Sequence, residues 1–66
     1  MKNDEVEIYL EMKLDGERFG KRADLFTDGV DEFWIPHSQI IEKTHIKDRD
    51  YNVIITEWIA KQKGII

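Results

Sequence analysis

The sequence predicts a mainly β protein, a small five-stranded antiparallel barrel of the SH3-like or OB-like type. A 3₁₀ turn after Pro36 and a short helix over about residues 56–63 complete the expected fold. Three observations predict this class. Apolar and polar residues alternate along residues 6–14, which is the period of a half-buried strand. Turn signals divide residues 15–55 into further short strands. The last residues carry helix start and stop signals, and the whole chain is expected to be one domain.

The first three strands are expected to form a meander. The apolar face of the first strand consists of Val6, Ile8, Leu10, Met12 and Leu14. Asp15-Gly16 suits a tight hairpin because both positions tolerate positive φ. Residues 17–26 then predict a weaker second strand, with Gly20 as a bulge or bend. Residues 27–29 are a second turn signal, and residues 30–35 predict the third strand.

The second half of the chain is expected to add two more strands. Pro36 cannot donate a ladder hydrogen bond, so it should end the third strand. Residues 37–39 fit a single 3₁₀ turn. Residues 40–46 favour extended structure, residues 47–50 form a polar loop, and residues 51–55 are β-branched and aromatic enough to predict the fifth strand.

A two-turn helix is expected to end the chain. The Thr56 hydroxyl can cap it by accepting a hydrogen bond from an N–H group of the first turn. Trp58 and Ile59 are expected to face the sheet, because so short a helix needs packing to be stable. Gly64 supplies a left-handed residue at the end, from which Ile65 folds back onto the helix.

The core of so small a chain has to come from apolar side chains or from association. The sequence contains no cysteine, so neither a disulfide nor a thiolate metal site can stabilise the fold. The residues expected in the core are Val6, Ile8, Leu10, Leu14, Phe19, Leu25, Phe33, Trp34, Ile40, Val53, Ile55 and Trp58. A homo-oligomer therefore stays open as an alternative to a self-sufficient monomer.

The net charge of −4 is concentrated in the first half of the chain. Residues 1–36 carry ten acidic and five basic side chains, whereas residues 37–66 carry four and five. This balance disfavours nonspecific nucleic-acid binding, which relies on phosphate neutralisation. No apolar run approaches the roughly 20 residues of a membrane span, and no signal-peptide pattern follows the charged first residues. We expect a cytoplasmic protein with no membrane partner.

The spacing of the polar residues disfavours a catalytic or metal site. His37 and His45 are not placed as two ligands on one helical face, and His37 is expected to shape the turn after the proline. Residues 48–52 begin like a calcium loop, but Val53 and Ile59 stand where a glycine and a bidentate glutamate belong. Ser38 beside His37 lacks a third triad member. We therefore expect no enzyme activity, no metal and no cofactor.

Nucleic-acid binding stays open as an alternative, because small barrels stack unpaired bases on aromatic side chains flanked by basic ones. The candidate stacking platforms are Tyr9, Phe33, Trp34 and Tyr51. The candidate phosphate contacts are Arg18, Lys21, Arg22, Lys43, Lys47 and Arg49. Phe33 and Ile35 should point one way along their strand and Trp34 the other. Only one of these two sets can face the core. The other must contact the C-terminal helix, a second copy of the chain in a dimer, or a partner.

Two passages of the chain resemble a group of short, uncharacterised phage and mobile-element proteins. They are residues 34–40, which match a W-I-P-x-S-x-I strand end, and residues 56–65, which match an ending E-W-[LI]-A-x-x-K-G-[LI]. Residues 14–17 resemble the Asp-Gly turn of the same proteins, against which residues 21–31 look like extra hairpin length. The resemblance implies a small barrel of phage or bacterial origin, and it brings no established activity.

Three functions are compatible with these features. The first is a non-enzymatic inhibitor whose acidic surface engages the basic groove of a host defence or nucleic-acid enzyme. The second is a single-stranded nucleic-acid-binding accessory protein, and the third is a structural homo-oligomer. The candidate partner-binding residues are Glu7, Tyr9, Glu11, Asp31, Glu32 and Trp34. The candidate nucleic-acid-binding residues of the alternative are Lys43, Lys47, Arg49 and Tyr51.

Overall fold

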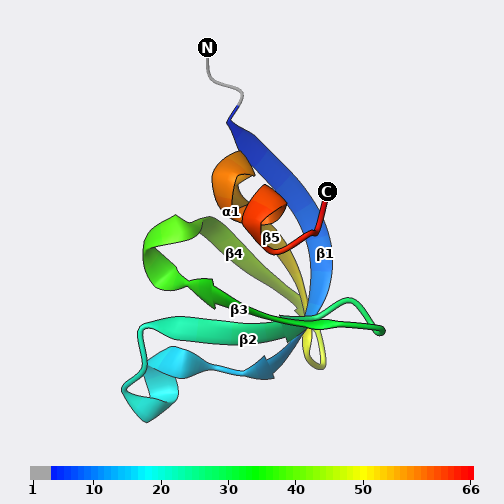
Figure 1. Ribbon diagram of the computed structural model, residues 1–66. Helices are drawn as coiled ribbons and strands as arrows, with labels where there is room; N and C mark the ends of the chain where they lie inside the picture. Colours follow the sequence, from blue (N-terminus) through cyan, green and yellow to red (C-terminus); the bar gives the residue numbers. More distant parts are fainter. Residues whose placement is uncertain (1–3) are drawn as a thin grey trace.

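A computed structural model describes residues 4–66, in which five strands form one antiparallel sheet (Figure 1). The strands are β1 (Glu5–Leu14), β2 (Ala23–Thr27), β3 (Glu32–Pro36), β4 (Ile40–Lys47) and β5 (Asp50–Thr56). The helical elements are two 3₁₀ turns, η1 (Gly16–Phe19) and η2 (His37–Gln39), and the helix α1 (Glu57–Gln62). This arrangement confirms the mainly β fold with five antiparallel strands, a 3₁₀ turn after Pro36 and a short C-terminal helix.

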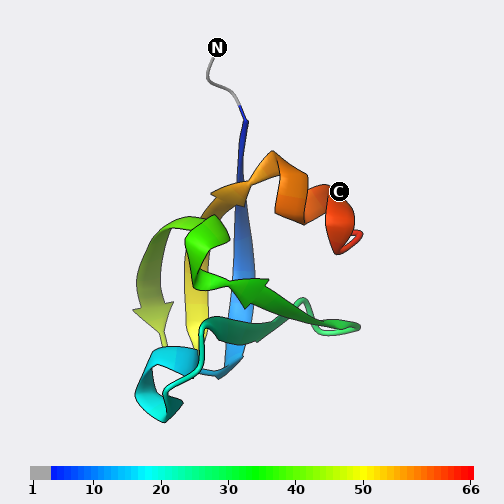
Figure 2. The ribbon, with the colours of Figure 1, turned by 60° about the vertical axis from the view of Figure 1, so that its left-hand side comes forward.

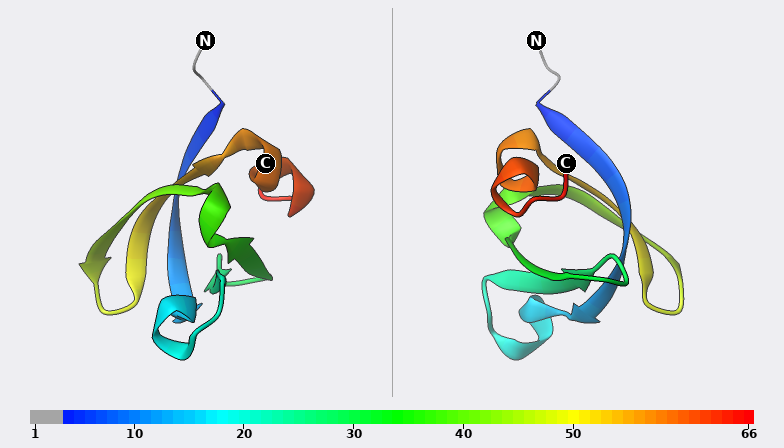
Figure 3. Two further views of the ribbon diagram at one scale, coloured as in Figure 1. Left: turned by 90° about the vertical axis from the view of Figure 1, so that its left-hand side faces the viewer. Right: turned by 45° about the vertical axis from the view of Figure 1, so that its right-hand side comes forward.

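The long strand β1 connects the two halves of the sheet. The strand order is β3-β2-β1-β5-β4, with the first part of β1 paired to β5 and its last part paired to β2. The sheet curls strongly, so that β2 and β3 run across the ends of β4 and β5 (Figures 1 and 3). Within residues 4–66, β3 and β4 are the two edges and are not paired with each other. Closure into an SH3-like or OB-like barrel therefore stays a prediction.

The buried core fills the inside of the curl. It consists of Leu10, Met12, Phe26, Phe33, Ile35, Val53, Ile55, Ile59 and Ala60. Four of these, Leu10, Phe33, Val53 and Ile55, were predicted from the sequence. Val6, Ile8 and Ile40, also predicted, are half-buried and pack against the core. Leu14 and Leu25 are half-buried as well.

Three residues that were predicted to lie in the core are exposed instead. Phe19, Trp34 and Trp58 are 63%, 43% and 60% exposed. Trp34 lies opposite Leu25 on the outer face of β3, because Phe33 and Ile35 point into the core. Within α1, Ile59 and Ala60 are the buried residues, and Trp58 faces away from them. Figure 2 shows the helix over one end of the sheet, with only one side turned toward it.

The predicted reversal after residue 15 is confirmed, but it is not a tight Asp15-Gly16 hairpin, and only residues 23–26 of the strand predicted over residues 17–26 are extended. The Asp15 carboxylate accepts a hydrogen bond from the N–H of Glu17 and so caps η1. Gly20, at φ 71°, ends this turn, and the N–H of Lys21 donates to the carbonyl of Gly16. The chain therefore reverses over residues 15–22, and β2 begins at Ala23. In β2 the buried side chains include Asp24 and Phe26, whereas the residues expected in the core from this part of the chain were Phe19 and Leu25.

The third strand begins two residues later than predicted. The Asp28 carboxylate accepts from the N–H groups of Val30 and Asp31, which shapes a turn before β3. Val30 is accordingly 86% exposed and outside the strand.

The predicted helix ends are confirmed. The Thr56 hydroxyl accepts from the N–H of Ile59 at 3.2 Å. At the other end the N–H of Gly64 donates to Lys61 and the N–H of Ile65 donates to Ala60, the paired bonds of a Schellman motif. No helix within residues 4–66 is long and apolar enough to cross a membrane.

Candidate functional site

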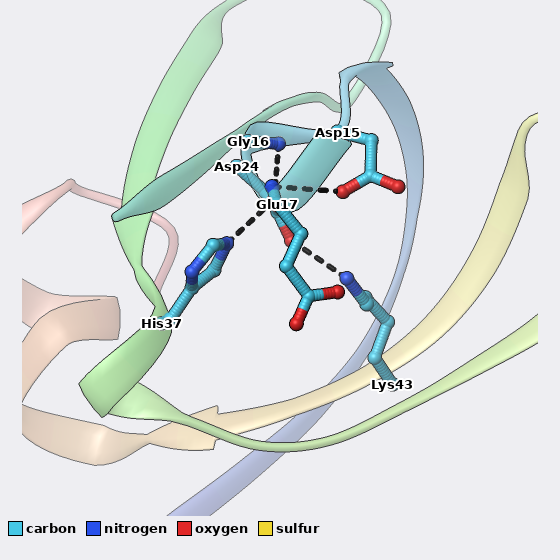
Figure 4. A network of polar contacts seen from close by, with 6 residues as sticks. All are labelled: Asp15, Gly16, Glu17, Asp24, His37 and Lys43. Atoms are coloured by element: carbon cyan, nitrogen blue, oxygen red, sulfur yellow. Dashed lines mark hydrogen bonds and ion pairs between the residues drawn. The ribbon is translucent and has the colours of Figure 1, made fainter. Parts of the chain in front are cut away.

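A fully buried carboxylate on β2 holds together three separate parts of the fold (Figure 4). Oδ1 of Asp24 accepts from the N–H of Gly16 in η1 at 2.7 Å and lies 2.8 Å from Nε2 of His37 in η2. Oδ2 of Asp24 accepts from Nζ of Lys43 on β4 at 2.8 Å. Because an ionised carboxylate only accepts, Nε2 of His37 must carry the proton of that hydrogen bond.

The partners of Asp24 keep it ionised. Burial raises the pKa of the Asp24 carboxyl, but hydrogen bonds from Lys43, His37 and Gly16 outweigh that effect and hold the pKa below its usual value. Burial likewise lowers the pKa of Lys43, and contact with Asp24 raises it above its usual value. The two shifts agree on one arrangement, an ion pair with both groups charged at neutral pH.

The cluster of Asp24, His37 and Lys43 connects β2 to η1, η2 and β4 and so contributes to the fold. Three donors occupy the two oxygens of Asp24, and within residues 4–66 no side-chain hydroxyl forms a hydrogen bond with Asp24, His37 or Lys43. Lys43, predicted as a phosphate contact, directs its ammonium group at Asp24 instead. The sequence reasoning missed Asp24, whose one signal was a lone carboxylate within the apolar run of β2.

An open groove on the outer face of the sheet is lined by carboxylates. We call it the acidic groove; it has a volume of about 570 Å³, and its lining includes Tyr9, Glu11, Thr27, Asp28, Ile46 and Asp50. Tyr9 is 73% exposed and Ile46 is 51% exposed. Of the residues that the structure describes, no lysine or arginine lines this groove.

Strand register brings the carboxylates of this groove together. Glu11 on β1 lies opposite Thr27 of β2 on one side and Asp50 of β5 on the other. Neither Glu11 nor Asp50 forms an ion pair with any of residues 4–66. Hydrogen bonds from the backbone of Asp31 and Val30 hold the pKa of Asp28 below its usual value, so this carboxylate stays charged. The groove therefore presents three carboxylates beside an exposed tyrosine ring.

The predicted partner-binding residues only partly converge on this groove. Tyr9 and Glu11 line it. Glu7 does not, but it lines a smaller pocket together with Tyr9, where its Oε2 accepts from the side chain of Asn52 at 2.6 Å. Glu32 is 3.8 Å from Lys13 and lies on β3. Asp31 and Trp34 do not line the groove. Asp28, Ile46 and Asp50 are the lining residues that sequence reasoning missed.

A second groove, adjacent to the first, carries basic and aromatic side chains. We call it the basic groove; it has a volume of about 370 Å³ and is lined by Lys13, Arg18, Phe19, Arg49 and Tyr51, with Met12, Leu14, Asp15 and Asp48. Arg49 and Tyr51 belong to the predicted nucleic-acid-binding set, and Arg18 to the predicted phosphate contacts. Lys13 and Phe19 were missed for this role.

The remaining candidates for nucleic-acid binding lie elsewhere. Lys43 is held by Asp24, and Lys47 lies opposite Asp50 on β4. The stacking platform predicted at Phe33 is wrong, because this ring is 6% exposed and belongs to the core. Lys21 and Arg22 lie in the segment before β2 and do not line the basic groove.

Comparison with known proteins adds no relative to these observations. No family model, no curated protein and no solved structure matches the chain. Within residues 4–66, no group of three or more metal-ligating side chains is placed to hold an ion.

Proposed function

We propose that the chain is a non-enzymatic interaction protein that binds a basic segment of a protein partner in the acidic groove. The observation that carries this proposal is the pairing of Glu11 with Asp50 beside exposed Tyr9. Like charges placed directly opposite each other disfavour the pairing of two strands, and a cationic partner would interact favourably with both carboxylates. A tyrosine exposed between carboxylates is also suited to contact an arginine or lysine side chain.

The partner that we propose is a host nucleic-acid or defence enzyme in the cytoplasm, whose basic cleft would supply the segment that enters the acidic groove. A cleft that binds phosphates is positively charged, and a small acidic surface complementary to it is attracted by its field. The resemblance to phage proteins supports a host enzyme as the target. The chain would then act as an inhibitor by occupying the cleft.

Binding of a labelled basic peptide, measured by fluorescence anisotropy, tests the groove. We expect the double variant Glu11→Lys with Asp50→Lys to weaken binding by at least about tenfold, because it reverses the charge at the centre of the groove. The double variant Glu42→Lys with Glu57→Lys changes the net charge equally away from the groove and should change binding less than about twofold. If both double variants weaken binding equally, the effect depends only on the net charge of the protein, which would contradict the proposal.

The contribution of the ring is tested at Tyr9. Tyr9→Phe keeps the aromatic face and should bind nearly as well as the wild type, whereas Tyr9→Ala should lose about fivefold. Inhibition of a panel of nucleases and defence nucleases then tests the target class. An enzyme inhibited by the wild type and not by the Glu11→Lys, Asp50→Lys variant supports the proposal. Inhibition that survives this double substitution would place the inhibitory surface elsewhere.

A further inference from the structure

We propose that the basic groove is a second binding site, for single-stranded nucleic acid. Three cationic side chains from three different parts of the fold surround it: Lys13 from β1, Arg18 from η1 and Arg49 from the turn between β4 and β5. Two arginines and a lysine offer phosphate contacts from more than one direction, as a backbone that crosses the groove requires.

The charge balance of the groove favours an anion. Its two carboxylates, Asp15 and Asp48, face three cations, and Asp15 already accepts the N–H of Glu17 as the cap of η1. Lys13 lies 3.8 Å from Glu32, with both side chains well exposed, a pair that solvent screens. Arg18 and Arg49 form no ion pair with any of residues 4–66, so both are available to phosphates.

Two rings in the same groove distinguish a nucleic acid from other anions. Phe19 is 63% exposed at the end of η1 and lines the groove. Tyr51 is half-buried and is backed by the ring of His45, with ring centres 5.1 Å apart. Unpaired bases stack on such rings, whereas an acidic peptide has no need of them and a duplex keeps its bases stacked inside.

The walls of the groove are fixed before any ligand arrives. The N–H of Gly16 is bonded to buried Asp24, which anchors η1 and with it Arg18 and Phe19. On the other wall, the carbonyl of Arg49 accepts from the N–H of Met12 at 2.8 Å, which ties the turn between β4 and β5 to β1. A site built on anchored elements loses less freedom when it binds.

The basic groove is separate from the acidic groove and does not depend on its proposed function. The paired residues Glu11 and Asp50 line only the acidic groove, and Arg18 and Phe19 line only the basic groove. Variants of one of these pairs therefore change no residue that lines the other groove. The net charge of −4 limits the affinity, and the release of counterions by the three cations makes the affinity depend on salt.

Fluorescence anisotropy of a labelled twelve-residue oligothymidylate at low salt tests the basic groove. We expect the variant Arg18→Glu with Arg49→Glu to weaken binding by at least about tenfold and Phe19→Ala by about fivefold to a hundredfold. Lys61→Glu with Lys63→Glu changes the charge equally at the end of α1 and should change binding less than about twofold. The logarithm of the affinity should fall with the logarithm of salt with a slope of about −2, for three cations on a single strand.

Four outcomes would overturn the inference. They are no binding of the oligonucleotide at low salt, equal weakening by the two charge-reversal pairs, equal affinity for a duplex of the same length, and equal affinity for a polyglutamate peptide. The last would identify an acidic protein segment as the ligand. Circular dichroism and a thermal melt of each variant separate lost binding from lost folding, and Phe19→Leu provides an apolar control without a stacking face.

Discussion

Asp24 is the residue on which the placement of the other elements depends most. Its carboxylate forms hydrogen bonds with η1, η2 and β4 and is fully buried. Its removal would leave the N–H of Gly16 without an acceptor and Lys43 without its ion-pair partner. A buried ion pair is costly to break from one side, because the remaining charge keeps its desolvation cost. The pair thus fixes geometry, and we infer that this is its role.

Asp24→Asn should lower the free energy of unfolding at pH 7 by about 2 kcal/mol, less than for a fully buried pair because a quarter of the Lys43 side chain stays exposed. Urea denaturation measures this, with Glu42→Gln as the exposed control. No change on Asp24→Asn would mean that the ion pair contributes nothing to stability.

The same pair predicts how stability depends on pH. The pKa of Asp24 is lowered on folding, so its contribution is present above the unfolded pKa of about 4 and is lost as pH falls through the folded pKa. The pKa of Lys43 is raised, so its contribution is present below the unfolded pKa and is lost as pH rises through the folded pKa. Thermal melts should show the highest stability between these limits, with a smaller decline in acid for Asp24→Asn. An acid decline as steep in the variant as in the wild type would contradict this assignment.

Adding a single methyl group at Gly16 should destabilise the fold strongly, because the backbone of Ala23 lies close to this position. A Cβ at this position would lie 1.8 Å from the carbonyl oxygen of Ala23, so the backbone would have to move. We expect Gly16→Ala to cost about 3 kcal/mol in urea denaturation. Gly20 has a φ of 71° and open space where a Cβ would lie, so Gly20→Ala should cost only about 1 kcal/mol. Similar costs for the two variants would contradict the close contact at Gly16.

At the residue scale, the sequence predicted which β1 side chains face outward and did not predict Asp24. Strict alternation along β1 places Tyr9 and Glu11 outside, and the structure has them there. Asp24 was not predicted to be buried because Phe19 was taken as a core residue of the second strand, which places residues 21, 23 and 25 on the inner face and Asp24 on the outer face. Once η1 takes residues 16–19 out of the strand, that assignment no longer holds.

At the scale of elements, the helix α1 is held by one narrow apolar face. Ile59 and Ala60 are buried, while Trp58 projects to the outside. Both ends of the helix could be predicted from the sequence, because Thr56, Gly64 and Ile65 each form their capping hydrogen bond with a residue at most five positions away. The direction of its face depends on the angle at which α1 leaves β5, which the sequence does not state.

The two neighbouring residues of α1 should therefore differ in their effect on stability. Ile59→Ala should lower the free energy of unfolding by about 3 kcal/mol, because it removes core volume. Trp58→Ala should change it by about 0.5 kcal/mol, as expected of an exposed position. Chemical denaturation of both variants measures the difference, and a larger loss at Trp58 would indicate that the ring packs against the fold.

At the scale of the whole molecule, charge is sorted into two adjacent grooves of opposite sign. The uneven charge of the sequence predicted an acidic surface but could not locate it. Asp28, in the turn before β3, and Asp50, at the start of β5, are far apart in the chain. The register of β1 with β2 and β5 brings them to Glu11. The basic groove likewise needs η1 and the turn between β4 and β5 to meet, which no local pattern predicts.

The most direct measurement is a titration of ¹⁵N-labelled protein with an unlabelled basic peptide, followed by NMR. Binding in the acidic groove should shift the amide signals of Tyr9, Glu11, Asp28, Gly29 and Asp50 in a saturable way, and it should leave those of η1 and α1 in place. The variant Glu11→Lys with Asp50→Lys should show no saturable shift. Shifts confined to other surfaces, or none at peptide concentrations of about 1 mM, would contradict the assignment of the acidic groove as the partner site.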